Sequence, residues 1–352
     1  MKKVIILIAG LLLSALSVFS QGCLPEGITF LRQAEIDSFP INYPGCSYIE
    51  GSVEISYLGD ITNLFGLNSL DSIGGYLEID CRRLHTLTGL NNLVKINEDL
   101  IIGACDSLVN LEGLSNLITI GENFTIVYNN SLINFEGVDN LNTIVGTLYV
   151  DNNFYLVNCS GLETLQTIGE GLFINENYSL QNLNGLESLS SVGSDLSLTT
   201  NHYLSDVSAL TSLDSIGGSL KIASSYELIN LNGLENLQYI GNGLTIDHCI
   251  NMQSIDSLRN ITTIPGDLVF TKNSSVPSLA GFNNITSIGG ELAIYVNPSL
   301  HNLEGLNSLN TIGGDLDVML NDSLSEFSGL QNLQTVNGNI LIRFNHKLTS
   351  LT

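Results

Sequence analysis

Basic residues are scarce in this 352-residue chain. It contains 11 Lys and Arg residues against 35 Asp and Glu residues, and its net charge at pH 7 is −24. The few basic residues are scattered, whereas nucleic acids and anionic membranes are bound by basic stripes or patches. The sequence therefore argues against both kinds of partner. Its acidity is typical of a surface that keeps a protein soluble or recruits cations and basic partners.

Long apolar runs are also missing, with one exception at the N-terminus. Lys2 and Lys3 precede the apolar segment Val4–Leu13, and small and polar residues follow as far as Ser20. This order is typical of a secretory signal peptide, so we expect residues 1–20 to be removed and the protein to be secreted or held at the extracellular cell surface. The alternative is a lipid anchor at Cys23, although residues 20–22 lack the usual aliphatic residue. No other apolar run is long enough for a transmembrane segment.

What the sequence does contain is a strict repeat. A Gly-Leu-type pair recurs every 24 residues without insertion. Its first residues are Gly89, Gly113, Gly137, Gly161, Gly185, Ala209, Gly233, Ser257, Gly281, Gly305 and Gly329. Such a period is typical of stacked coils, each of which buries its apolar side against its neighbours.

Each repeat contains one short alternating segment. In Phe124-Thr125-Ile126 apolar and polar residues alternate, and like triplets recur from Val53–Ile55 to Ile340–Ile342. This period of two predicts a strand with one face in the core. Each strand is reached by one full turn of chain, so consecutive strands should run parallel. The coil between Ile73 and Ile96 is one residue short. We therefore predict an all-β fold, a parallel β-helix or solenoid of about thirteen 24-residue coils.

Two ladders of turn residues flank the predicted strands. Gly-containing pairs such as Pro265-Gly266 and Asn337-Gly338 precede the strands, and we predict a positive φ at the second residue of each pair when it is Gly. After the strands comes an Asn ladder: Asn129, Asn153, Asn177, Asn201, Asn273, Asn297, Asn321 and Asn345, with Cys105 and Cys249 at the same position. An inward Asn can bond backbone groups that a turn leaves unpaired, so we predict a structural role.

The cysteines suggest one structural disulfide and leave a second open. Cys23 and Cys46 flank a segment that looks helical over Gln33–Phe39 and should stop at Pro40. A disulfide between them would pin an N-terminal helical cap, residues 21–48, over the end of the first coil. Cys81 and Cys105 occupy like positions on adjacent coils, so a disulfide between them is an alternative to two free thiols. Cys159 takes a core position and should be a buried free thiol. No spacing fits a zinc site.

Catalytic constellations are absent from the sequence pattern. The five histidines fall on different coils and no Ser–His–Asp set shares a face; they are His85, His202, His248, His301 and His346. We therefore predict that the protein is not an enzyme. A polysaccharide-active β-helix enzyme is the alternative, and it would need clustered carboxylates or a basic group beside bound calcium.

The outward strand face carries the candidate ligand-binding residues. Its middle column does not repeat: Glu54, Glu78, Ile101, Thr125, Tyr149, Phe173, Ser197, Lys221, Thr245, Val269, Ala293, Asp317 and Leu341. Tyr149 and Phe173 are adjacent in this column, with Ile101 and Val127 close by. Exposed aromatic rings of this kind stack on sugars or anchor protein partners. The alternative is that the two rings only stabilise the sheet as a cross-strand pair.

A second candidate site consists of carboxylates. Asp267, Glu291 and Asp315 occupy the same outward position on three successive coils, with Asp317 two residues further on. Hard oxygen ligands suit calcium, the one cofactor that this sequence suggests. The alternative is that these side chains point into water, where screening reduces their repulsion.

The repeat unit resembles a known family. The segment 303–316, Leu-Glu-Gly-Leu-Asn-Ser-Leu-Asn-Thr-Ile-Gly-Gly-Asp-Leu, resembles the receptor L-domain repeat, a leucine-rich-repeat-like unit. That repeat occurs in the ligand-binding lobes of the insulin and epidermal growth factor receptors, in fungal cell-wall glycoproteins and in secreted surface proteins of Bacteroidetes. The opening Cys23–Phe30 is similar to that of the bacterial proteins. The resemblance implies a right-handed solenoid at the cell surface, over residues 49–352. It also implies a missing C-terminal sorting domain, so we expect the chain to be truncated.

Together these features predict a secreted or cell-surface binding or adhesion module without catalytic activity. Its ligand would be a glycan or a protein bound on the outward strand face. The alternative is a passive structural rod at the surface. A binding module should carry a non-repeating patch on its outward face, and a rod should not.

Overall fold

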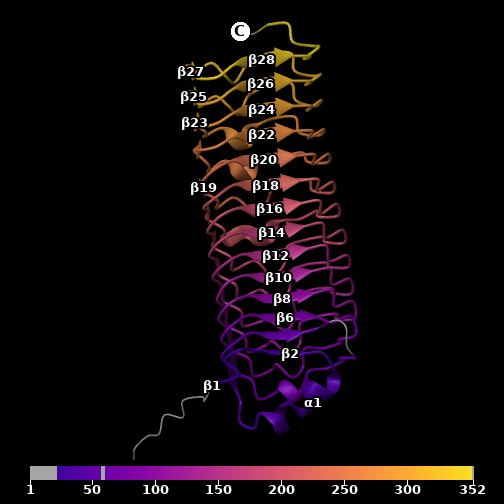
Figure 1. The fold of residues 1–352 in the computed structure, drawn as a ribbon. Coiled ribbons are helices and arrows are strands. Elements are labelled where there is room, and N and C mark those ends of the chain that lie inside the picture. Colours follow the sequence, from indigo (N-terminus) through magenta and orange to yellow (C-terminus); the bar gives the residue numbers. More distant parts are fainter. Residues whose placement is uncertain (1–21, 57–59, 351–352) are drawn as a thin grey trace, which may run out of the picture.

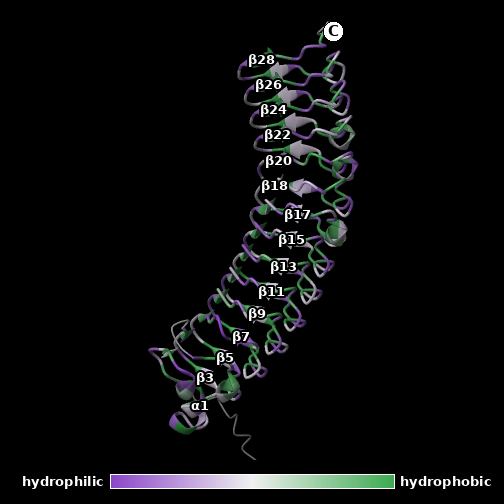
Figure 2. Cartoon of the chain, turned by 90° about the vertical axis from the view of Figure 1, so that its right-hand side faces the viewer, coloured by the Kyte–Doolittle hydropathy of each residue, from purple (hydrophilic) through white to green (hydrophobic). Residues whose placement is uncertain are grey.

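The computed structural model describes residues 22–56 and 60–350, so the predicted signal peptide lies outside the described residues. The coils stack in one column from the N-terminal helix to the C-terminal coil (Figure 1). All strand pairs are parallel, which confirms the predicted all-β solenoid. Figure 2 shows that the column is curved, with β20 (Leu244–Asp247), β28 (Ile340–Arg343) and the even-numbered strands between them along its concave side.

The largest sheet, here called the front sheet, has 14 strands, one from each level of the stack. These strands are β2 (Ile28–Phe30), β4 (Val53–Ile55), β6 (Leu77–Asp80), β8 (Leu100–Gly103), β10 (Phe124–Val127), β12 (Leu148–Asp151), β14 (Leu172–Asn175), β16 (Leu196–Thr199), β18 (Leu220–Ala223), β20 (Leu244–Asp247), β22 (Leu268–Thr271), β24 (Leu292–Tyr295), β26 (Leu316–Met319) and β28 (Ile340–Arg343).

Two-residue strands form the back of the stack. Ten of them make one sheet: β1 (Gly22–Cys23), β3 (Tyr48–Ile49), β5 (Ser72–Ile73), β7 (Lys95–Ile96), β9 (Thr119–Ile120), β11 (Thr143–Ile144), β13 (Thr167–Ile168), β15 (Ser191–Val192), β17 (Ser215–Ile216) and β19 (Tyr239–Ile240). Four more make a separate sheet: β21 (Thr263–Ile264), β23 (Ser287–Ile288), β25 (Thr311–Ile312) and β27 (Thr335–Val336).

A proline separates the two back sheets. In regular coils the residue after each back strand donates its N–H to the preceding coil, as Gly241 does to the Ile216 carbonyl (2.9 Å) and Gly289 to the Ile264 carbonyl (2.8 Å). Pro265 occupies this position after β21 and has no N–H to donate. The bond that would link β21 to Ile240 therefore cannot form, whereas the front sheet continues unbroken past this level.

The core lies between the front and back sheets and follows the predicted alternation. Leu100 and Ile102 of β8 are fully buried, whereas Ile101 between them is partly exposed. Complete burial of each such side chain contributes about 1.5–3 kcal/mol to folding. The short coil is also as expected, because Ser72 pairs with Lys95, 23 residues later, without breaking the register. Strand β2 was not predicted from the sequence; it pairs with β4 and adds one strand to the front sheet.

The N-terminal cap contains the helix α1 (Gln33–Asn42), which buries Ile36 and Phe39. The Phe39 ring lies 5.8 Å from that of Phe30 in β2, so the helix covers the end of the core. We expected the helix to stop at Pro40, but it continues for two residues, and the Tyr43 N–H closes the last turn on the Phe39 carbonyl (2.9 Å).

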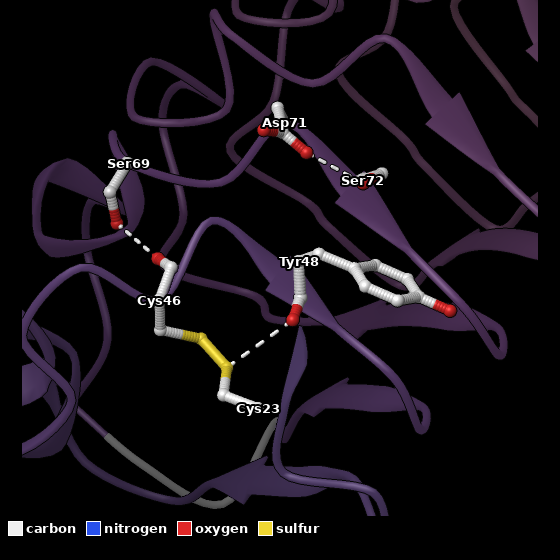
Figure 3. The surroundings of a disulfide bond; sticks show 6 residues. All are labelled: Cys23, Cys46, Tyr48, Ser69, Asp71 and Ser72. Atoms are coloured by element: carbon white, nitrogen blue, oxygen red, sulfur yellow. Dashed lines mark hydrogen bonds between the residues drawn. A yellow bond between two sulfur atoms is a disulfide. The ribbon is translucent and has the colours of Figure 1, made fainter. Parts of the chain in front are cut away.

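The predicted disulfide between Cys23 and Cys46 is present, with the two Cα atoms 5.9 Å apart (Figure 3). It joins β1 to the segment between α1 and β3. Cys23 Sγ lies 3.3 Å from the Tyr48 carbonyl oxygen, and the Cys46 carbonyl accepts a hydrogen bond from the Ser69 hydroxyl (2.9 Å) (Figure 3). The disulfide closes the cap on itself, and the Ser69 hydrogen bond attaches it to the first coil.

Short 3-10 turns replace the Gly turn in some coils. They are η1 (Phe65–Leu67), η2 (Ser208–Ser212), η3 (Asp256–Leu258) and η4 (Ala280–Phe282). Ala209 and Ser257 fall in two of these turns, whereas most Gly residues of the 24-residue repeat have φ near +110° to +120°. A residue with a Cβ avoids that conformation, which accounts for the 3-10 turn at Ala209 and Ser257. Gly66 and Gly281 adopt the same turn in η1 and η4, so a Cβ is not the only cause of it.

The predicted positive φ before the front strands is wrong. Gly266 and Gly338 do not have positive φ. Glycine is needed there for space: a Cβ on Gly338 would collide with Asp315 Oδ1, and one on Gly266 with Asn242 Oδ1, both from the preceding coil. The left-handed conformation occurs instead after the front strands from β8 to β28, directly before the Asn ladder. The residues are Ala104, Tyr128, Asn152, Glu176, Thr200, Ser224, His248, Lys272, Val296, Leu320 and Phe344.

Candidate functional site

The outward face of the front sheet places the predicted column in register. Thr125 lies opposite Tyr149, and Tyr149 lies opposite Phe173, on the neighbouring strands β10, β12 and β14. Since side chains in register on a parallel sheet are direct neighbours, the face has the non-repeating character read from the sequence. Acidic residues lie at its N-terminal end, aromatic residues near its middle and mixed residues beyond them.

Tyr149 and Phe173 are stacked. Their ring centroids are 5.2 Å apart and the ring planes differ by 11°. The Phe173 ring folds back over Gly171, which has no room for a Cβ. Tyr149 remains 40% exposed. The pair borders a shallow hollow of about 420 Å³, whose polar wall includes Thr147, Glu170 and Ser194.

The two aliphatic residues predicted beside this pair lie on the same face but at its margin. Ile101 is two strands from Tyr149, because Thr125 stands between them in register. Val127 lies further along β10, opposite Asp151 of β12. The structure therefore brings Tyr149 and Phe173 together and leaves Ile101 and Val127 as flanking apolar surface.

The carboxylates predicted to bind calcium are used differently. Asp267 Oδ1 accepts the Glu291 N–H of the next coil (2.7 Å), and Asp315 Oδ1 accepts the Asn339 N–H in the same way (2.6 Å). Glu291 and Asp317 both contact the Tyr295 hydroxyl, at 2.7 and 2.8 Å. Burial and these two contacts raise the pKa of Tyr295. Within residues 22–56 and 60–350, no three His, Cys, Asp or Glu side chains lie together in a way that could hold a metal ion.

The predicted calcium site is therefore not assembled. Turn carboxylates and amides cap backbone N–H groups one coil further on, as Asp99 does for Asn123 (2.8 Å) and Asp195 for Ser219 (2.7 Å). Because the coils are stacked, a turn side chain lies directly below the backbone N–H of the next coil and can accept a hydrogen bond from it. Glycines such as Gly338 are needed beside these side chains because a Cβ would collide with them.

A second acidic group lies at the N-terminal end of the face. The Tyr76 hydroxyl and the Thr29 hydroxyl both donate to Glu54, and these bonds lower the pKa of that carboxyl. The same contact raises the pKa of Tyr76 to about 12. Burial and the nearby Glu54 charge raise the pKa of Glu78, and burial raises that of Asp80. Glu54, Glu78 and Asp80 border a hollow of about 220 Å³.

The open alternative of a disulfide between Cys81 and Cys105 is not realised, because both are free and buried. Cys105 stands in the Asn ladder and acts as its other members do. Its Sγ accepts the Cys81 N–H (3.4 Å), and its own N–H is bound by Asn129 Oδ1 (3.0 Å). Cys159 is a buried free thiol, as predicted. Burial raises the pKa of Cys159 to about 12, so it stays a thiol at neutral pH.

The sequence analysis did not predict a role for the aromatic residues that lie just after the front strands. Phe154, Tyr178, His202 and Tyr226 each directly follow a residue of the Asn ladder position, at intervals of 24 residues. The 24-residue spacing of these rings is a signal in the sequence, but it lies outside the outward column of the front strands, where binding residues were predicted.

A curved stack of parallel coils, with a Leu-rich core and a buried ladder of mostly Asn residues behind the front strands, defines a leucine-rich-repeat solenoid. The sequence also matches the family model described as the BspA type leucine rich repeat region, in 6 copies, over residues 56–176, 125–244 and 199–321. These matches cover more than half of the chain, and the protein belongs to that family. Among curated proteins, none matches the chain. No helix within the part that the structure describes is long and apolar enough to cross a membrane.

Proposed function

We propose that this protein is a secreted or cell-surface binding or adhesion module, without catalytic activity, that recognises a glycan or protein ligand on the outward face of its front sheet. The repeat family and the solenoid identify a protein-interaction or surface repeat module. The particular ligand face and the adhesive role go further, and they rest on the side chains of that face.

The observation that supports this proposal is the stacked pair of Tyr149 and Phe173 beside a hollow. The neighbouring coils have Thr125 and Ser197 in the same column, and their strands keep the same register. The fold therefore does not need aromatic residues at this level. Aromatic rings offer a large apolar contact area at a low entropic cost, and the nearby Thr147, Glu170 and Ser194 can hydrogen-bond a polar ligand.

A binding screen with a matched variant tests the proposal. The chain without residues 1–20 is screened against immobilised glycans and extracellular proteins, and each hit is measured again with Tyr149→Ala/Phe173→Ala. We expect binding to fall at least about tenfold, since an exposed aromatic contact is worth roughly 1 kcal/mol or more. Thermal stability should change little.

The control is Tyr239→Ala, which removes an exposed tyrosine from the back strand β19. It should leave binding unchanged. The proposal fails if no ligand is found and the double variant only lowers the melting temperature, because the pair would then serve the sheet alone and the protein would be a passive rod.

We also propose that residues 1–20 direct export. The mass of the exported chain tests this directly, because cleavage after Ser20 leaves Gln21 as the first residue. An exported chain that retains the leader would contradict the assignment.

A further inference from the structure

A continuous row of aromatic rings runs along the corner that follows the front strands. We call it the corner ridge; its residues are Phe154, Tyr155, Tyr178, His202, Tyr226 and His248. Adjacent ring centroids along it lie between 4.6 and 6.1 Å apart. The ridge therefore follows the stack from the coil of β12 to that of β20.

The fold does not require this ridge. The same corner position holds Asp106 and Asn130 in the coils before it, and Ser274 and Asp322 in coils after it. Asn130 binds Asp106 there (2.9 Å), so polar side chains serve this corner equally well. Rings fill this position in four successive coils, from Phe154 to Tyr226, and at the other end of the stack only His346 occupies it. An unbroken run of rings in the middle of the stack is expected for a binding surface rather than for a structural ladder.

The ridge offers ring surface to a partner. Phe154 is 48% and Tyr155 58% exposed, whereas Tyr178, His202 and Tyr226 are half-buried. His202 and Tyr226 stack with their planes 10° apart, but the contacts of Tyr178 with Phe154 and His202 are tilted by 54° and 55°. Tilted neighbours cannot cover one another completely, so part of a ring face remains open at these contacts.

The surroundings of the ridge are acidic. Residues 151–250, which contain it, have eleven Asp and Glu residues and a single basic residue, Lys221. Glu176 lies two residues before Tyr178, and Glu227 directly follows Tyr226. Neither carboxylate forms an ion pair within the described residues. Open aromatic faces in a part of the chain with this excess of carboxylates are the surroundings that an organic cation prefers.

We propose that the corner ridge binds a basic polypeptide segment, whose Arg and Lys side chains lie against the rings and pair with Glu176 and Glu227. Arginine should bind better than lysine, because a planar guanidinium both stacks on rings and forms two hydrogen bonds to a carboxylate. The ridge is separate from the pair of Tyr149 and Phe173, so this inference does not depend on the ligand of that pair.

Two peptides of equal charge test the inference. Fluorescent nona-arginine and nona-lysine are titrated into the whole chain without residues 1–20, at near-physiological salt, with anisotropy as the readout. Tyr178→Leu/Tyr226→Leu removes two rings and keeps apolar bulk. Two exposed cation–π contacts predict binding of nona-arginine that is weaker by about five- to thirtyfold in this variant. Tyr239→Leu, on the back of the stack, is the matched control and should bind as the unmodified protein does.

A second variant keeps every ring and so avoids any loss of packing. Glu176→Gln/Glu227→Gln should weaken binding and reduce its dependence on salt, because two charge contacts are lost. The inference is overturned if both double variants bind nona-arginine like the Tyr239→Leu control, since the attraction would then come from the diffuse acidic surface. It is also overturned if the protein prefers nona-lysine, or if only neutral oligosaccharides bind in a way that the leucine variant abolishes.

Discussion

Asn177 should be among the residues on which the stability of the stack depends most. It is fully buried and links three coils. Its Oδ1 accepts the Asn153 N–H from the preceding coil (2.9 Å), and its Nδ2 donates to the Val150 carbonyl (2.8 Å). Its own N–H is bound by Asn201 Oδ1 of the next coil (3.0 Å).

Asn177→Ala would leave the Asn153 N–H and the Val150 carbonyl without these partners in a dry interior. A buried polar group that loses its partner costs about 1–3 kcal/mol, so we expect a loss of roughly 2–6 kcal/mol in the free energy of unfolding. Asn177→Cys should cost less than the alanine variant, because Cys105 already accepts a backbone N–H at a like position. Asn184→Ala, at an exposed position with no side-chain hydrogen bond recorded in the described region, should change stability by about 0.5 kcal/mol or less.

The assay needs a local readout, because long repeat arrays can unfold in parts and then have no single free energy of unfolding. Native-state hydrogen exchange gives one, and the Asn153 amide should lose most of its protection in Asn177→Ala. Urea denaturation followed by circular dichroism supplies the order of the three variants. If Asn177→Ala unfolds at the same urea concentration as Asn184→Ala, or the Asn153 amide stays protected, then the ladder does not carry the stability assigned to it.

Two further predictions concern buried thiols and the repeat glycine. The four free cysteines should not react with a thiol reagent at pH 8 until the protein is denatured. Burial raises the pKa of Cys105, Cys159 and Cys249 to about 12, so the unfolded chain loses these protons at a lower pH than the folded one. Their stabilising effect should therefore be complete below about pH 8.5 and decline towards pH 12, by on the order of 1 kcal/mol per thiol at pH 10. Cys159→Ala should flatten this decline, and an unchanged pH profile would contradict it. Gly161 has φ +109° and lies against the Phe135 carbonyl, so Gly161→Ala should lower stability by about 1–3 kcal/mol, measured by thermal melting. Gly103→Ala, where a Cβ would meet Val127 at an ordinary 3.6 Å, is the control, and equal melting temperatures would refute the steric argument.

The architecture could be predicted from the sequence because one period encodes it. An interval of 24 residues places like side chains on top of one another, so the register of Thr125, Tyr149 and Phe173 followed directly. The buried Asn ladder could be inferred for the same reason, since it depends only on position within a coil and on residue type. The disulfide of the cap could be inferred because Cys23 and Cys46 flank the helical segment.

The contacts between coils were harder to predict. Gly338 was taken as a residue with positive φ, yet its role is to leave room for Asp315, which is 23 residues away. Asp267 and Glu291 looked like neighbouring free carboxylates, yet one binds the backbone N–H of the other. In both cases the partner becomes visible only when the coils are stacked, because residue type alone does not show whether an acceptor faces water or an N–H group.

Pro265 gives the two walls of the stack different mechanical properties. The front wall is one continuous sheet, so coils on either side of this level cannot separate there without breaking several strand-to-strand bonds. The back wall lacks a bond at the same level, which makes it the more extensible of the two. We therefore expect the column to bend most easily at Pro265, in the direction that opens the back and brings the two halves of the concave front face closer together.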